Sequence, residues 1–139
     1  MAIYIVTMNG EVQAKQRPKF NRKTGVAYTP HDTTVFESTL RMLAQKAVER
    51  AEGKPFENAC KVFINITKKV PSSFSKKRKL ELCRSFAPVT TKPDLDNCAK
   101  SILDALNGIF YTDDKLVAEL LIKKVYGEYD AFCVKCEEL

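Results

Sequence analysis

The sequence predicts a single α+β domain in which two main helices pack against a mixed or antiparallel β-sheet. Three observations lead to this prediction. The chain has 139 residues, which supports one hydrophobic core but not two. Residues 60–67 place an apolar side chain at every second position, which is the spacing of a strand. Residues 34–51 and 97–106 repeat apolar side chains every three or four positions, which is the spacing of a helix. We expect one domain over residues 1–139.

Strands are expected at both ends of the chain and in its centre. Residues 2–8 are rich in β-branched side chains, and Asn9-Gly10 after them is a turn signal that favours a returning strand. Residues 15–30 contain prolines and a glycine, which predicts a long loop or an irregular hairpin. The expected strands cover residues 2–8, 11–15, 60–67, 117–126 and 131–137.

The first main helix is expected over residues 34–51. Thr33 or Thr34 would cap its start, because a threonine hydroxyl can accept a hydrogen bond from a free backbone N–H. Gly53 and Pro55 would end it.

The second main helix is expected over residues 97–106, with Asp96 as its N-cap and a left-handed stop at Asn107-Gly108. A basic excursion over residues 68–92 precedes it. Within this excursion, residues 75–84 predict a short helix with Leu80 and Cys83 facing inward.

Charge is distributed unevenly along the chain. The net charge is +6, but residues 1–92 hold 18 Lys and Arg against 7 Asp and Glu, whereas residues 93–139 hold 5 against 10. A basic body beside an acidic segment suggests a phosphate-binding surface next to a site that needs carboxylates. No apolar run reaches the roughly 18 residues of a membrane helix, so we expect no membrane association.

The cysteines and the single histidine exclude several classes of site. Five cysteines and no secretory signal favour reduced thiols in the cytoplasm. Cys133 and Cys136 form a CxxC pair, but they fall in an expected strand, where their sulfurs would point to opposite faces. His31 is the only histidine, and nothing near it supports a Ser/His/Asp triad or a zinc site. We expect no organic cofactor.

The chemically informative residues follow the basic excursion. Asp94 and Asp96 flank Leu95, so in an extended segment their side chains share one face and can hold a hard cation. Lys100 lies one turn into the expected helix, and a chain reversal at Asp113-Asp114 would return a carboxylate to the start of that helix. Carboxylates without histidine favour Mg²⁺ or Mn²⁺ over zinc. The alternative is that Asp94 and Asp96 form a capping turn, that Asp113-Asp114 is a polar loop, and that Lys100 is a solvated helix residue.

These residues carry a family resemblance. The run PDLDNCAKSILDALNG followed by YTDD resembles the signature of the RusA family of Holliday-junction resolvases, and Arg17-Pro18 and residues 25–30 resemble its prophage-type members. Its pattern is Asp-x-Asp-Asn, a lysine four residues after the second Asp, Asp-Ala-Leu, a Gly turn and a paired Asp-Asp. The family comprises small, homodimeric, Mg²⁺-dependent endonucleases, which implies paired nicking of branched DNA in recombination and repair.

The resemblance also implies residue roles. Asp94, Asp96 and Asp114 would bind the metal, with Asp113 as an adjacent carboxylate, and Lys100 would be the catalytic lysine. Asp104 would be structural, because eight residues of helix place it about 12 Å from Asp96. A homodimer is also expected because a four-way junction needs two nicks on opposing strands.

Basic side chains are the expected DNA contacts, since Lys and Arg bind phosphates with little base information. Phe20, Tyr28, Phe74 and Phe86 are interleaved with them and could stack at an opened junction. Two other functions remain open: a non-catalytic DNA-binding module, and a nuclease that acts on flaps or forks. The expected DNA contacts are Arg17, Lys19, Arg22, Lys23, Lys69, Lys76, Lys77, Arg78, Lys79 and Arg84.

Overall fold

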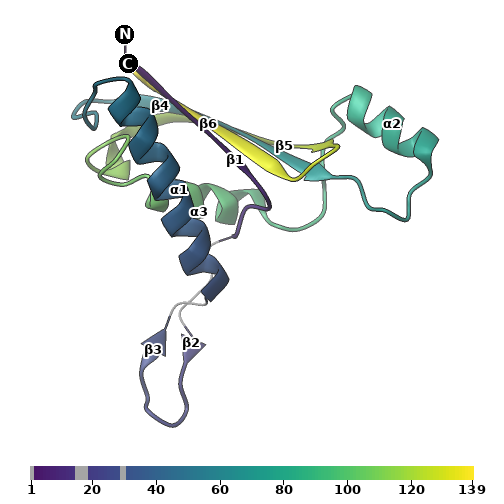
Figure 1. The fold of residues 1–139 in the computed structure, drawn as a ribbon, viewed down its shortest axis with the longest axis horizontal. Helices are drawn as coiled ribbons and strands as arrows, with labels where there is room; N and C mark the ends of the chain where they lie inside the picture. The colour runs from purple at the N-terminus through teal and green to yellow at the C-terminus, as the bar shows by residue number, and fades with distance from the viewer. Residues whose placement is uncertain (1, 15–18, 29–30) are drawn as a thin grey trace.

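The computed structural model describes residues 2–14, 19–28 and 31–139, and of residues 19–20 and 27–28 it describes the backbone alone. Within these residues the fold is α+β, with helices on one face of a four-stranded open sheet (Figure 1). The predicted fold class is confirmed. In the described part of the chain, no helix has the length and apolar character required to cross a bilayer.

The sheet is mixed, with strand order β1-β6-β4-β5. Strand β6 runs antiparallel to both β1 and β4, whereas β4 and β5 run parallel. A parallel pair needs a long crossover, and here residues 70–116 supply it and carry the candidate site. The strands are β1 (Ile3–Asn9), β4 (Cys60–Lys69), β5 (Val117–Gly127) and β6 (Ala131–Glu138).

The core lies between one face of the sheet and two helices, α1 (His31–Arg50) and α3 (Leu95–Ala105). Val62 and Ile64 of β4 point into it, while Phe63 points to the opposite face, as the alternating pattern predicts. Helix α1 packs against β1 and α3. The opposite face of the sheet carries no helix in the described part of the chain (Figure 1).

The segment after β1 is the first correction. Residues 11–14 are not a strand, and residue 15 of the predicted strand lies outside the described residues; β1 pairs with β6 along its whole length. The Gly10 N–H donates to the Asp130 carbonyl at 2.7 Å, and Val12 is buried in the core. The Gln13 carbonyl accepts a hydrogen bond from the Ser101 hydroxyl at 2.6 Å, so this segment is tied to α3 instead of the sheet.

The start of α1 also differs from the prediction. The helix begins at His31, so neither Thr33 nor Thr34 is its cap. Thr33 is buried because it continues the helix stripe of Phe36 and Leu40, at the three- and four-residue spacing of one face. The predicted capping signal was therefore part of the buried face.

Two basic elements project from this body (Figure 1). Of the long loop or irregular hairpin predicted over residues 15–30, the described part is a hairpin of β2 (Lys19–Phe20) and β3 (Ala27–Tyr28), and residues 15–18 and 29–30 lie outside the described residues. Helix α2 (Lys76–Arg84) begins after Ser75, whose hydroxyl accepts from the Arg78 N–H. The structure describes all of α2, and none of its residues is buried. Leu80 is 50% exposed, so the prediction that Leu80 faces inward is wrong.

Candidate active site

Helix α3 begins one residue after Asp94, which is its N-cap with extended backbone angles. Asp96 lies in the first turn of the helix, so its prediction as the N-cap is wrong. The extended Asp94-Leu95-Asp96 geometry is wrong for the same reason: residues two positions apart on a helix point about 200° apart. Among the described residues, the Asp94 side chain makes no capping hydrogen bond, which leaves its carboxylate exposed at the helix start.

The negative charges of Asp94 and Asp96 nevertheless act on the same buried thiol, that of Cys98. The pKa of the Cys98 thiol is raised, first by burial and then by the negative charges of Asp94 and Asp96, while Lys124 opposes the rise. Cys98 lies on the inner face of α3 together with Ile102, both fully buried. The apolar face of α3 thus holds the two carboxylates at a fixed place above the core.

The outer side of α3 carries a row of charges. Asp96, Lys100 and Asp104 follow at four-residue steps, which places them one above the other on the helix surface. The Lys100 ammonium forms an ion pair with the Asp104 carboxylate at 3.1 Å between Nζ and Oδ1. The side chain of Asp104 therefore contacts the predicted catalytic lysine directly.

The Asp113-Asp114 pair is held beside this row. Tyr111 is fully buried and donates its hydroxyl to the Leu103 carbonyl of α3 at 2.8 Å. The Asp113 carboxylate accepts from the Lys115 N–H at 2.9 Å, and this hydrogen bond is the main reason that its pKa is lowered. A short 3-10 turn, η1 (Asp114–Leu116), then leads into β5.

Asp114 lies in a field of negative charge. Its pKa is raised, first by the loss of solvent and then by Asp113 and Asp104, and Lys100 opposes that rise. The charges of Asp104 and Lys100 act on Asp114, so the chain reversal after α3 places this carboxylate within electrostatic range of the helix, and its return to the helix start stays a prediction. Crowded carboxylates of this kind favour a bound cation.

The donor atoms fit a hard divalent ion. The candidate ligands offer carboxylate oxygens, which suit Mg²⁺ and Mn²⁺. Across residues 2–14, 19–28 and 31–139, no three His, Cys, Asp or Glu side chains converge into one metal-holding group. Mg²⁺ commonly binds through one or two carboxylates plus waters and substrate phosphates, so it does not need such a cage. The roles of Asp94, Asp96, Asp113, Asp114 and Lys100 remain predictions.

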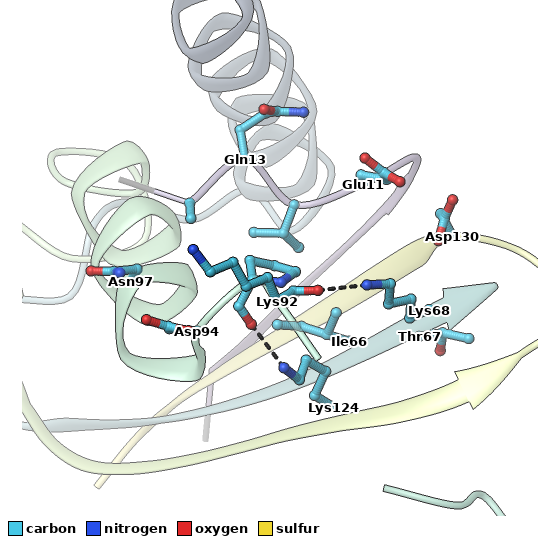
Figure 2. Close-up of a pocket in the computed structure, with 13 residues that line it drawn as sticks. Glu11, Gln13, Ile66, Thr67, Lys68, Lys92, Asp94, Asn97, Lys124 and Asp130 are labelled. Atoms are coloured by element: carbon cyan, nitrogen blue, oxygen red, sulfur yellow. Dashed lines mark hydrogen bonds between the residues drawn. The ribbon is translucent and has the colours of Figure 1, made fainter. Parts of the chain in front are cut away.

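A cavity of about 370 Å³ opens beside the start of α3 (Figure 2). It lies between the 11–14 segment, the ends of β4 and β5, and residues 92–97. Lys68 and Lys124 enter it from the strands and donate hydrogen bonds to the loop before Asp94. Lys68 falls within the basic excursion over residues 68–92, whereas Lys124 was not predicted to lie at the site, because its place in a strand carries no local signal of such a role.

The predicted DNA contacts fall on the two projections. Arg22 and Lys23 are exposed in the β2–β3 turn. Lys69 ends β4, and α2 carries Lys76, Lys77, Arg78, Lys79 and Arg84. Arg17 lies outside the described residues, and Lys19 is described by its backbone alone.

Three of the aromatic side chains in the described residues, Phe74, Phe86 and Tyr129, are at least partly exposed. The Arg78 guanidinium lies over the Phe74 ring, 4.0 Å from its centroid. Phe86 is 70% exposed, as expected of a stacking residue, and Tyr129 is 72% exposed but was not singled out from the sequence.

Comparison with known proteins identifies the family of the chain. The family model "Endodeoxyribonuclease RusA" matches residues 9–136. A relative, the "Uncharacterized protein YqaN" of Bacillus subtilis (strain 168), is 34% identical over 125 residues, which cover 88% of this chain and 87% of the relative. The resemblance read from residues 93–114 thus extends over nearly the whole domain, and the chain belongs to the RusA family of endodeoxyribonucleases.

Proposed function

We propose that this protein is a Mg²⁺-dependent endonuclease that resolves Holliday junctions by paired nicks during DNA recombination and repair, in the cytoplasm. The family supports a nuclease that acts on branched DNA. The observation that carries the proposal is the Lys100–Asp104 ion pair on α3 together with the hydrogen bond from the Tyr111 hydroxyl to the Leu103 carbonyl, because that bond ties the segment that ends in Asp113-Asp114 to the helix that carries the rest of the family motif.

In this proposal, Asp94, Asp96 and Asp114 are the carboxylates that would bind Mg²⁺ or Mn²⁺, with Asp113 beside them, and because no three carboxylates of the described residues converge, waters and the substrate phosphate would complete the coordination. Such an ion neutralises the phosphodiester and activates the attacking water. Lys100 directs its ammonium to the charge that develops on the phosphate, and Asp104 holds that ammonium in place at 3.1 Å. Asp104 is therefore proposed to position Lys100.

The two basic projections would hold the DNA. Helix α2 has five Lys and Arg residues against Glu81 alone, and most of them are exposed. Phosphate contacts of this kind release counterions and weaken steeply as salt rises. Phe74 and Phe86 lie in the same basic excursion over residues 68–92 and offer rings for stacking on unpaired bases.

We further propose that the protein acts as a homodimer whose subunits meet through the helix-free face of the sheet. Ile5, Phe63 and Leu121 are exposed there in one cross-strand row with Lys135 between them. The row on one side contains Lys61, Glu119 and Glu137 and the row on the other side contains Lys123, so this face carries charges of both signs on a basic protein and two copies can approach with little repulsion. Sedimentation of Leu121→Asp beside wild type tests this interface: a wild-type monomer, or a dimer that the substitution leaves intact, would contradict it.

One assay tests the proposed activity. A labelled four-way junction is incubated with the protein and Mg²⁺, and wild type is compared with Asp96→Asn and with the control Glu49→Gln, an exposed acid near the end of α1. We expect wild type and Glu49→Gln to cut and Asp96→Asn to bind without cutting. Junction binding by wild type without any cleavage in Mg²⁺ or Mn²⁺ would support the DNA-binding module instead.

The same assay separates the nuclease alternatives. Junction, flap, fork and duplex substrates are compared at equal concentration. We expect the junction to be cut fastest and by two symmetric nicks. Faster cleavage of flaps or forks would favour a related metal-dependent nuclease.

A further inference from the structure

We propose that Lys68 and Lys124 are positioning residues for the candidate active site: their ammonium groups hold the main-chain carbonyls of residues 91–93 and thereby fix Asp94 and the start of α3. The inference rests on the proposed function for its catalytic consequence, whereas the contacts themselves are a property of the fold.

The two lysines emerge side by side from the parallel strands. In the β4–β5 register, Ile66 pairs with Lys124 and Lys68 pairs with Tyr126. Ile66 is buried in the core, so Lys124 and Lys68 lie on the helix-covered face, at the end of the core. Both are partly buried, unlike most of the lysines on α2. The sheet therefore supplies a rigid base for both ammonium groups.

Both ammonium groups are used on one short loop (Figure 2). Lys124 Nζ donates to the Pro93 carbonyl at 2.8 Å, and Lys68 Nζ donates to the Lys92 carbonyl at 2.5 Å. Outside the view of Figure 2, Lys124 Nζ also donates to the Thr91 carbonyl, and Lys68 Nζ donates to the Thr91 hydroxyl at 3.2 Å. Three successive carbonyls are thus held by two cations, and hydrogen bonds to charged donors are stronger than neutral ones.

The loop needs these partners because it leaves the sheet at this point. Up to Val89 the chain pairs with β5: the Tyr126 N–H donates to the Ala87 carbonyl at 3.0 Å, and the Val89 N–H donates to the Lys124 carbonyl at 2.9 Å. Beyond Val89 this backbone pairing ends, and the lysine side chains take over the carbonyls that strand pairing would otherwise satisfy.

The held carbonyls directly precede the functional residues. Pro93 is followed by Asp94, the N-cap whose carbonyl accepts the first helix hydrogen bond, from the Cys98 N–H at 3.1 Å. No free residue stands between the fixed carbonyl and the Asp94 carboxylate. A movement of this loop would therefore move Asp94 relative to Lys100 and Asp114, and misplacement by about 1 Å can cost about 100-fold in rate.

Two substitutions on neighbouring residues of β5, each of which removes one positive charge, give the test. Lys124→Met removes the ammonium that holds the loop, and Lys124→Arg keeps a cation there. Lys123→Met makes the same change on the opposite face of the sheet, where Lys123 is exposed. Lys68→Met provides a second, independent variant. Thermal unfolding confirms that each full-length variant is folded before it is compared.

The first measurement is amide hydrogen exchange, which needs neither metal nor DNA. We expect Lys124→Met to speed exchange at residues 94–98 at least fivefold, Lys68→Met to speed it less, and Lys123→Met to leave it unchanged. Unchanged exchange in both Lys124→Met and Lys68→Met would overturn the inference. This outcome is independent of whether wild type cuts DNA, so failure of the proposed function and failure of the inference are distinguishable.

The second measurement separates positioning from DNA binding. We expect Lys124→Met to lower the single-turnover cleavage rate at saturating junction at least tenfold, to leave the junction Kd in EDTA within twofold of wild type, and to be largely rescued in Lys124→Arg. A loss of cleavage explained entirely by a weaker Kd would make Lys124 a DNA contact and overturn the positioning role. Full cleavage by Lys124→Met would overturn it as well.

Discussion

Helices α3 and α2 lie in the same crossover between β4 and β5, yet they are built for different tasks. Helix α3 buries Cys98, Ile102 and Ala105 against the core and presents its charges in a row that alternates in sign. Helix α2, which the structure describes in full, has no fully buried residue and presents charges of nearly one sign. A buried face fixes side chains to the accuracy that chemistry needs, whereas phosphate binding tolerates a loosely seated helix.

The most sensitive test of this comparison replaces one lysine on each helix with methionine. Lys100→Met should lower the cleavage rate about 100-fold or more, because it removes a positioned charge at the phosphate, while junction binding stays near wild type. Lys77→Met on α2 should leave the cleavage rate at saturating junction unchanged and weaken binding slightly. Single-turnover kinetics with a labelled junction measures both. Equal effects of the two substitutions would show that α3 carries no special chemistry.

Truncation of one apolar side chain on each helix tests the difference in packing. Ile102→Ala should lower the free energy of unfolding by about 2–5 kcal/mol, because Ile102 is fully buried and its removal leaves a cavity. Leu80→Ala should change it by no more than about 0.5 kcal/mol, since Leu80 is 50% exposed. Urea unfolding of the two variants provides the values. A cost above that range for Leu80→Ala would mean that α2 is packed against a surface in solution.

Removal of charge from α2 tests its role in binding. Replacing Lys76, Lys77, Arg78 and Lys79 with Gln should weaken junction binding about tenfold or more at low salt. The slope of log affinity against log salt should become shallower by about three to four, one for each lost phosphate contact. Fluorescence anisotropy over a salt series measures both quantities. An unchanged slope would assign DNA binding to another surface.

Sequence reasoning succeeded where one physical signal acted alone. The period of two over residues 60–67 and the period of three to four in α1 and α3 reflect burial on one face, and the structure has these elements at nearly the predicted bounds. The family motif from Pro93 to Asp114 pointed to α3 and the Asp-Asp turn, and the family match bears out the resemblance.

It failed where two local signals competed or where a partner came from far along the chain. Asp94 and Asp96 are both good caps, and only the backbone conformation of Asp94 decides between them. The 11–15 strand was expected from the Asn9-Gly10 turn, but β6, more than 120 residues away, pairs with β1 instead. Lys124 holds a loop 31 residues earlier in the chain, a contact that no local pattern encodes.

The smallest expected effect comes from the thiols, and it probes the same two helices without any assay of activity. Cys98 on α3 is fully buried and its pKa is raised, so it holds less thiolate at any given pH and should alkylate slowly in the native protein. Cys83 on α2 is half-buried and should react about tenfold faster or more at pH 8, because the thiolate must be accessible to react. Iodoacetamide labelling followed by peptide mass spectrometry gives the ratio of the two labelling rates.

As a control, the two cysteines should react at similar rates in urea, since the difference arises from their places in the fold. If Cys98 reacted as fast as Cys83 in the native state, α3 would open as readily as α2, and the contrast between a fixed α3, proposed to carry the catalytic residues, and a loosely seated α2, proposed to bind DNA, would have to be abandoned.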